Sequence, residues 1–174
     1  MPRLDMRSLQ AHLPTPVSVQ AEFKLRGHEI LLQYKLNDPK HEVLDSLAPG
    51  SWPSFPRADE LWKTTCLEAF WGVPGEKGYW ELNLSPAKRA WNVYHFTGYR
   101  VPQPPARSED FQLISVEASA DSLNAKLTSR VPLAKLEVSL TAVVRTAQGT
   151  NYFALKHASP KPDFHLRDTF VLGT

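Results

Sequence analysis

Apolar residues alternate with polar residues along several short segments of the chain. Every second residue is apolar across residues 17–25, and the same period resumes across residues 30–36 after Gly27-His28. Such alternation is typical of strands with one buried face, and the short glycine-containing connection predicts a β-hairpin. The same two-residue period recurs in residues 65–71, 79–85, 91–96, 111–119 and 136–144, and, after the turn at Gln148-Gly149, in residues 152–155.

Short strands with turn residues between them predict an all-β fold. No long segment has the 3.6-residue period of a helix, so an antiparallel sandwich is favoured over alternating strands and helices. We expect helical turns only near residues 41–47 and 58–61. The 15 prolines cluster in stretches that we interpret as loops, and neither a repeat nor a long linker divides the chain. We therefore expect residues 1–174 to form a single domain.

The two faces of one strand differ sharply in polarity. Across residues 79–85, Trp80, Leu82 and Leu84 share one face, which we assign to the core, and Glu81 and Asn83 share the other. By the same reasoning Leu67, Ala69 and Trp71 face the core in the preceding strand, and Glu68 faces outward. If the two strands form a hairpin, Glu68, Glu81 and Asn83 lie together on one sheet face, which could equally be an ordinary solvated face.

Composition excludes several classes of function. The formal net charge is only +2, which gives no support for binding to nucleic acids or to membrane surfaces. No apolar run approaches the roughly 18 residues that span a bilayer. The single cysteine, Cys66, rules out an intramolecular disulfide, and the first residues lack the apolar segment of a signal peptide. We therefore expect a cytoplasmic protein; the sequence does not indicate its oligomeric state.

Aromatic residues are dense near the two glutamates. All five tryptophans lie between Trp52 and Trp91, more than core packing of this region requires. An indole beside carboxylate, amide and guanidinium groups is suited to carbohydrate, because the ring covers the C–H face of a sugar while polar groups bond its hydroxyls. Trp62 is the candidate platform, with burial in the core as the alternative, and Arg100 is preferred to Arg89 as the guanidinium. Tyr94 completes the expected set on this side.

Four segments together resemble a known family. Residues 57–70, 79–86 and 91–100, with the closing residues 157–165, resemble bacterial DOMON-like proteins, whose neighbours are the family 9 carbohydrate-binding modules. The resemblance implies a sandwich related to the jelly roll, with sugar or haem bound on a sheet face. It places Trp62 and Glu68 where a family 9 module has a stacking tryptophan and a hydroxyl-binding glutamate. Some relatives carry a domain resembling UDP-N-acetylmuramate dehydrogenase, which suggests a nucleotide sugar or cell-wall precursor as the ligand.

The C-terminal segment of residues 157–168, called the tail below, contains prolines that restrict its backbone, and it has three possible interpretations. Its side chains include His157, Lys161, Asp163, His165 and Asp168, and two histidines with a carboxylate could hold a transition metal. Alternatively, prolines fix the loop and Asp163 bonds its backbone amides. In a third interpretation the loop borders the ligand site, and His157 and Lys161 reach an anionic group of the ligand.

Catalysis and haem binding are the remaining alternatives. Glu68 and Glu81 could serve a glycoside hydrolase if their carboxyl groups lie close enough together. Cys66 with His95 could form a nucleophilic pair. For haem, the methionines Met1 and Met6 fall in a polar leader that we expect to lie far from any strand, which leaves His95 as a candidate ligand.

The prediction is a non-catalytic protein that binds a sugar-like small molecule at Trp62, Glu68, Glu81, Asn83, Tyr94, Arg100, His157 and Lys161, without a cofactor or metal.

Overall fold

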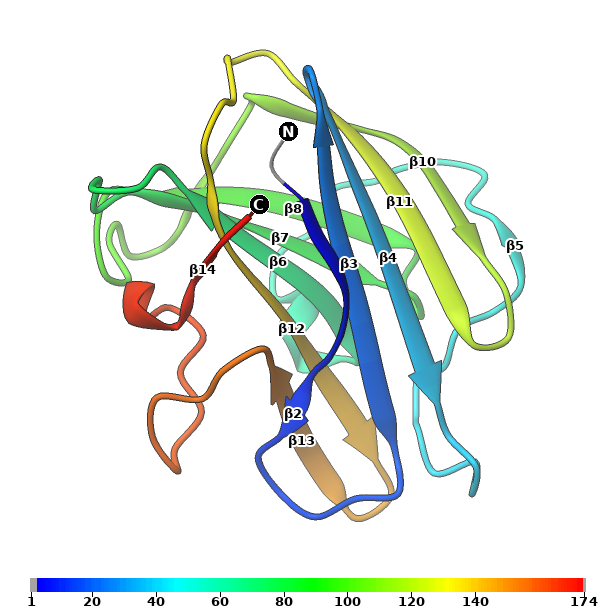
Figure 1. Ribbon diagram of the computed structural model, residues 1–174. Coiled ribbons are helices and arrows are strands. Elements are labelled where there is room, and N and C mark those ends of the chain that lie inside the picture. The colour runs from blue at the N-terminus through cyan, green and yellow to red at the C-terminus, as the bar shows by residue number, and fades with distance from the viewer. Residues whose placement is uncertain (1–2, 174) are drawn as a thin grey trace.

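The chain folds into two antiparallel sheets that lie face to face (Figure 1). The computed structural model describes residues 3–173. Within that range the regular structure consists of strands β1 to β14 and two short 3-10 helices, η1 (Leu61–Lys63) and η2 (Arg167–Thr169). The predicted all-β sandwich is confirmed.

The first sheet has six strands and is built around the predicted hairpin. The hairpin consists of β3 (Ser18–Arg26) and β4 (Glu29–Asn37), which pair in the register expected from their alternation. The order across the sheet is β1-β3-β4-β11-β10-β5. The other four strands are β1 (Arg3–Ser8), β5 (Gly50–Ser51), β10 (Phe111–Ala118) and β11 (Ser122–Ser129).

The second sheet has eight strands and carries the candidate site. Its order is β2-β13-β12-β6-β7-β8-β9, and β14 pairs with β12. The central strands are β12 (Glu137–Thr146), β6 (Cys66–Gly72), β7 (Tyr79–Ser85) and β8 (Ala90–Phe96). The shorter strands are β2 (Gln10–Ala11), β9 (Ala106–Arg107), β13 (Gly149–Ala154) and β14 (Val171–Leu172).

The main core fills the space between the sheets. Trp71 of the eight-stranded sheet meets Phe111 of the six-stranded sheet edge to face, with ring centroids 5.0 Å apart, and lies 6.5 Å from the ring of Phe23. Leu82 and Leu84 of β7 are fully buried in the same cluster. The inner-face assignments made from the alternation are therefore correct. Burial of each such side chain contributes roughly 1.5–3 kcal/mol to stability.

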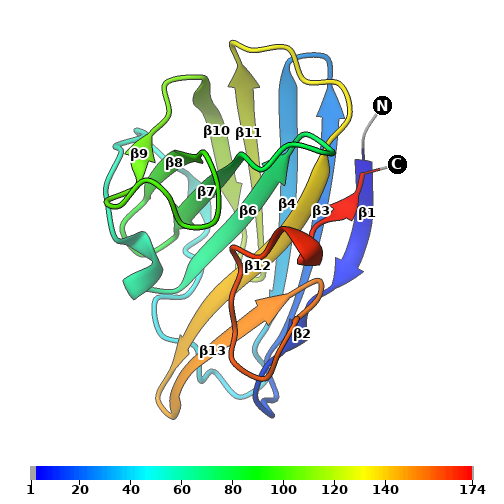
Figure 2. The ribbon, with the colours of Figure 1, turned by 90° about the vertical axis from the view of Figure 1, so that its left-hand side faces the viewer.

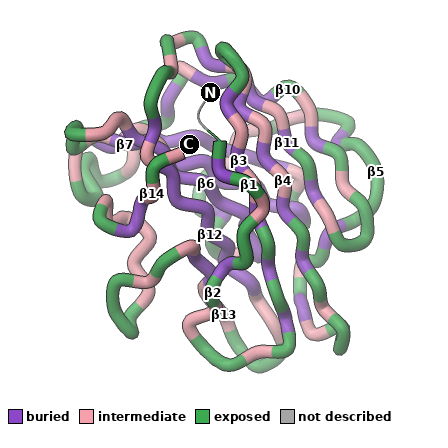
Figure 3. The backbone as a smooth tube through the Cα atoms, in the orientation of Figure 1, coloured by how far each residue is buried: buried purple, intermediate pink, exposed green. Residues whose placement is uncertain are grey.

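The outer face of the eight-stranded sheet is covered rather than solvated. Every residue of β6 is buried, and so is nearly every residue of β7 and β8 (Figure 3). Figure 2 shows why: the segment between β13 and β14 and the loop between β8 and β9 lie in front of this sheet. A strand with one wet face would alternate in burial, as β3 does. The covering segments create the second buried layer in which the candidate site lies.

Three local predictions are corrected by the structure. Residues 41–47 form bends and an isolated bridge at Val43 instead of a helical turn, because Asp38 accepts the backbone N–H groups of Glu42 and Val43. The other predicted turn lies three residues later, at η1. Residues 3–8 form strand β1 paired with β3, so Met6 lies within a strand and not in a leader far from strands; Met1 is outside the described residues.

Neither helix within residues 3–173 has the length and apolar character required to cross a membrane.

Candidate functional site

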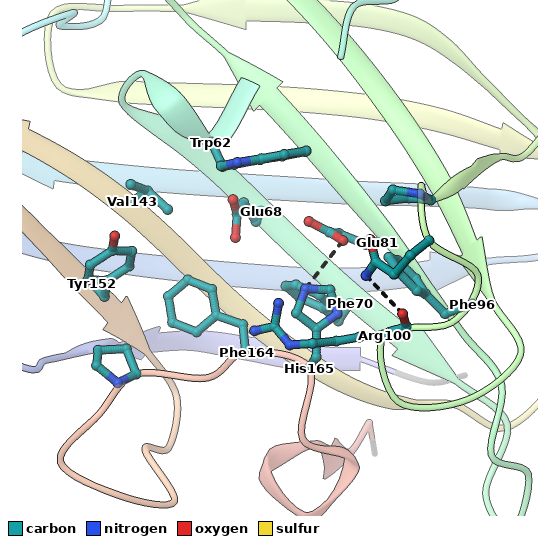
Figure 4. Close-up of a pocket in the computed structure, with 13 residues that line it drawn as sticks. Trp62, Glu68, Phe70, Glu81, Phe96, Arg100, Val143, Tyr152, Phe164 and His165 are labelled. Carbon is teal, nitrogen blue, oxygen red and sulfur yellow. Dashed lines mark hydrogen bonds and ion pairs between the residues drawn. The ribbon is translucent and has the colours of Figure 1, made fainter. Parts of the chain in front are cut away.

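A cavity of about 370 Å³ lies over the outer face of the eight-stranded sheet (Figure 4). Strands β6, β7 and β12 form its floor. The wall residues come from η1, from the β8–β9 loop and from the segment that precedes η2. The lining residues are Trp62, Glu68, Phe70, Glu81, Phe96, Arg100, Gln103, Pro105, Val143, Tyr152, Pro162, Phe164 and His165.

Two glutamates stand on the floor of this cavity. Strand register places Glu68 directly opposite Asn83 on β7 and Thr141 on β12, while Glu81 is the diagonal neighbour. The predicted hairpin of β6 and β7 is thus confirmed, and so is the prediction that Glu68, Glu81 and Asn83 share one face of the sheet. Glu68 is 2% exposed and Glu81 is 6% exposed. Thr141 donates a hydrogen bond of 3.0 Å to Glu68, and no lysine or arginine within the described chain forms an ion pair with either carboxylate.

Burial makes both carboxyl groups weaker acids than a glutamate in water. Loss of solvent raises the pKa of Glu68 well above its usual value, and the neighbouring Glu81 raises it further against the effect of the Thr141 hydrogen bond. Burial raises the pKa of Glu81 to about 7, against smaller opposing effects of Asn83 and Arg100. Both carboxyl groups therefore keep their protons to higher pH than an exposed glutamate does, and hydrogen-bond donors of a ligand would stabilise their ionised forms.

Asn83 lies beside the two carboxyl groups without a hydrogen-bond partner. Its side chain is fully buried, and neither its amide nitrogen nor its amide oxygen forms a hydrogen bond in the described structure. The amide is close enough to Glu81 to lower the pKa of that group. Unsatisfied buried amides are costly, so this group favours the entry of water or a polar ligand atom near the glutamates.

His165 connects the cavity wall to Glu81. The backbone N–H of Arg100 donates to the Tyr79 hydroxyl at 3.2 Å, so the single hydroxyl proton of Tyr79 is free to donate to His165 Nδ1, 2.8 Å away. In the tautomer in which Nδ1 accepts this bond, the imidazole proton is on Nε2, which lies 3.8 Å from Glu81 Oε2. Burial, with the charge of Arg100, lowers the pKa of His165 to about 4. His165 is thus a neutral donor that faces Glu81.

Arg100 is held at the cavity wall by the tail. Its guanidinium forms an ion pair of 3.0 Å with Asp163 and donates a hydrogen bond to the Tyr99 hydroxyl, which in turn donates to Asp163. The residue adopts a left-handed backbone with φ of 53°, and Gln103 donates to its carbonyl oxygen at 2.8 Å. Burial tends to raise the pKa of Asp163, but these bonds outweigh it and the pKa is lowered. The expected fixed turn beside Tyr99 is therefore present.

Aromatic rings line two sides of the cavity. Trp62 is 38% exposed, and its ring lies 6.4 Å from that of Tyr94 in an edge-on contact. Tyr94 is anchored by a hydrogen bond of 2.7 Å to Asp59. Figure 4 shows Trp62 on one side of the glutamates and Tyr152 and Phe164 on the other. A flat ligand above the carboxyl groups would therefore meet apolar rings at both sides.

The structure places six of the eight predicted site residues in the cavity lining or beside it. Trp62, Glu68, Glu81 and Arg100 line the cavity, and Asn83 and Tyr94 are buried on the same sheet face next to it. His157 and Lys161 lie outside the lining. The His157 Nε2 atom bonds the carbonyl oxygen of Gln10 at 2.7 Å, and Lys161 is exposed to solvent.

The described residues do not form the arrangement that a metal site in the tail, or a nucleophilic pair of Cys66 and His95, would require. His157 and His165 point to different partners, and within residues 3–173 no group of three or more histidine, cysteine or acidic side chains could hold a metal ion. Asp163 does bond the backbone N–H of His165, as the loop interpretation expects. His95 packs on Trp80 at the inner face, whereas Cys66 lies on the outer face, so the two form no pair.

Sequence reasoning predicted Arg100 and, in one interpretation, a tail loop that borders the site, and the loop does line the cavity; the reasoning chose the wrong side chains of that loop. Phe164 and His165 line the cavity although their segment has no two-residue period, and Tyr152 was assigned only to a strand. The available signal was compositional: a histidine and a phenylalanine stand between two prolines and a short helix. Nothing local shows that His165 contacts Tyr79, which is 86 positions away in the chain.

Comparison with known proteins shows the class of fold. No protein-family model and no curated protein matches the chain. A solved protein from Bacteroides uniformis described as carbohydrate-binding superposes with a TM-score of 0.70 at 13% identity, covering 97% of this chain and 85% of that one. A family 9 carbohydrate-binding module from Caldicellulosiruptor kristjanssonii, solved with cellotriose, gives a TM-score of 0.58 at 6% identity, over 97% and 80% of the two chains. The same kind of module with glucose gives 0.50 at 5% identity, over 86% and 72%.

The chain therefore has the β-sandwich fold found in carbohydrate-binding proteins.

Proposed function

We propose that this chain is a non-catalytic domain that binds a small carbohydrate in the cavity over the eight-stranded sheet. The observation that carries the proposal is the combination of a half-exposed indole, Trp62, with two buried carboxyl groups, Glu68 and Glu81, that have unused acceptor capacity. The fold shared with carbohydrate-binding proteins supports it, because those proteins use the same sandwich.

The chemistry of the cavity matches the two kinds of surface on a sugar. The C–H face of a pyranose is apolar and packs on an aromatic ring such as Trp62, with Phe164 at the opposite side. Sugar hydroxyls donate to Glu68 and Glu81, and they accept from the Nε2–H of His165 and from Arg100. Buried charge-assisted hydrogen bonds of this type are about twice as strong as neutral ones.

The size of the cavity favours a small sugar. Its volume of about 370 Å³ lies near the lower end of the roughly 300–1,000 Å³ range of ligand pockets. A nucleotide sugar, the other ligand suggested by the family resemblance, has phosphates that His157 and Lys161 were expected to contact. Neither residue lines the cavity, and Arg100 is already paired with Asp163. We therefore propose a monosaccharide or disaccharide without a phosphate group.

We also propose that the chain belongs to the bacterial DOMON-like proteins and acts in the cytoplasm as a single domain. The sandwich fold supports the family assignment, and the four sequence segments that suggested it contribute Trp62, Glu68, Glu81, Arg100 and His165 to one cavity. Cell fractionation with an antibody against the native protein tests the location.

A binding titration with variants tests the proposed function. Glucose and cellobiose are titrated into the wild type, and the experiment is repeated with Trp62→Ala and Glu68→Gln. We expect binding that each substitution weakens at least tenfold, while Glu76→Gln, an exposed control in the β6–β7 loop, leaves it unchanged. If both cavity variants bind as the wild type does, the sugar site is not here.

The proposal assigns no catalytic role to the glutamate pair. Incubation with a panel of chromogenic glycosides should give no turnover above the rate of a Glu68→Gln/Glu81→Gln double variant. Turnover that the double variant abolishes would instead establish the hydrolase alternative.

A further inference from the structure

The cavity has a surplus of acidic groups that a neutral sugar would not use fully. Glu68 and Glu81 face the same space, and their protein partners are a threonine hydroxyl and the neutral imidazole of His165. The only arginine in the cavity lining is Arg100, and Asp163 already neutralises it. Among the described residues, then, both carboxylates lack a cationic partner.

The walls of the cavity suit a cation as well. Five aromatic side chains line it, namely Trp62, Phe70, Phe96, Tyr152 and Phe164. The face of an aromatic ring attracts a positive charge within about 6 Å, more strongly where water is excluded. Carboxylates beneath a set of aromatic rings are a common arrangement for binding an ammonium group.

We infer that the cavity binds an amino sugar, a sugar with a protonated amine, in preference to its neutral counterpart. The inference rests on the proposed function and adds the chemical class of the ligand. The ammonium group lies against Glu68 and Glu81, donates to their free oxygen atoms, and contacts the wall rings. The remaining sugar ring packs on Trp62.

The energetics of the site point in the same direction. Burial raises the pKa of Glu81 to about 7, so the ionised carboxylate is unfavourable in the empty site. A cationic ligand offsets that cost directly, whereas a neutral hydroxyl offsets it only in part. A buried charge that lacks a partner is destabilising, so a charge on the ligand is the natural counterion for these carboxylates.

Paired ligands that differ in charge test the inference. At pH 7.0, the wild type is titrated calorimetrically with glucose, N-acetylglucosamine, glucosamine and 6-amino-6-deoxyglucose. We expect at least one amino sugar to bind tenfold or more tightly than its neutral counterpart, a difference of about 1.4 kcal/mol. The preference should shrink to threefold or less in Glu81→Gln and persist in Glu76→Gln, whose carboxylate lies outside the cavity.

The outcomes separate this inference from the proposed function. Neutral sugars that bind as tightly as both amino sugars overturn the inference and leave the sugar site intact. An absence of binding by all four ligands overturns the proposed function and the inference with it. If Glu81→Gln is unfolded, the ligand comparison in the wild type still decides, and Glu68→Gln replaces it as the charge-removing variant.

Discussion

Replacement of Glu81 by glutamine should change how the stability of the protein depends on pH. The Glu81 carboxyl has its pKa raised from 4.5 in the unfolded chain to about 7 in the folded protein. Below pH 4.5 it is protonated in both states and has no effect. As the pH rises from 4.5 to 7, the unfolded state releases its proton first, so the folded state loses stability. Glutamine removes this loss because it carries no titrating proton.

The size of the effect follows from the pKa difference. The span from 4.5 to about 7, at about 1.4 kcal/mol per pH unit, amounts to roughly 3 kcal/mol at pH 8. His165 acts in the opposite direction, since its pKa falls from 6.5 to about 4 on folding. Its contribution is present above pH 6.5 and is lost as the pH falls towards 4. Between about pH 4.5 and 6.5 the contribution of His165 therefore opposes those of Glu81 and Glu68, whose pKa values are both raised.

Urea unfolding followed by tryptophan fluorescence, at half-unit steps from pH 5 to pH 8, measures this effect. The free energy of unfolding of Glu81→Gln, relative to wild type, should increase by about 2.5 kcal/mol between pH 5 and pH 8, because the unfolded chain has already lost part of its protons at pH 5. The exposed control Glu76→Gln should show a constant difference. A Glu81→Gln difference that stays constant with pH would show that Glu81 titrates normally, and it would refute the description of a buried, proton-holding pair.

Three further substitutions test other parts of the structure. Tyr34→Phe removes the hydroxyl that donates to the carbonyl oxygen of Glu68 across the core, and urea unfolding should show a loss of about 1 kcal/mol or more. Arg167→Ala removes an ion pair of 2.7 Å with Glu137, and hydrogen exchange of residues 156–170 should become faster while strands β6 to β8 remain protected. Trp62→Ala should change the free energy of unfolding by less than about 1 kcal/mol, because its ring is partly exposed; a larger loss would assign it to the core.

The sandwich was predictable because its strands carry a two-residue period. Leu82 and Leu84 alternate with Glu81 and Asn83, and the structure buries the first pair between the sheets. Strand β11 shows the same signal in Leu123, Ala125 and Leu127, and it was overlooked. Where a strand is half buried, the local pattern and the fold agree, because each side chain responds to one face of the sheet.

The covered outer face was not predictable from the same pattern. A mixed face of glutamate, asparagine and tyrosine has the composition of a wet surface, so alternation alone left solvent and ligand as equal alternatives. The covering is decided by contacts distant in sequence, such as Arg100 with Asp163 and Tyr79 with His165. Those contacts depend on how irregular loops close over a sheet, for which the sequence has no periodic signal.

The position of a bound sugar tests the central claim most directly. A crystal structure of the protein with a saturating sugar or amino sugar should show its ring between Trp62 and Phe164, with donors within about 3 Å of Glu68 and Glu81. A ligand bound on the six-stranded sheet, or a cavity that stays empty while the sugar binds in solution, would contradict the account.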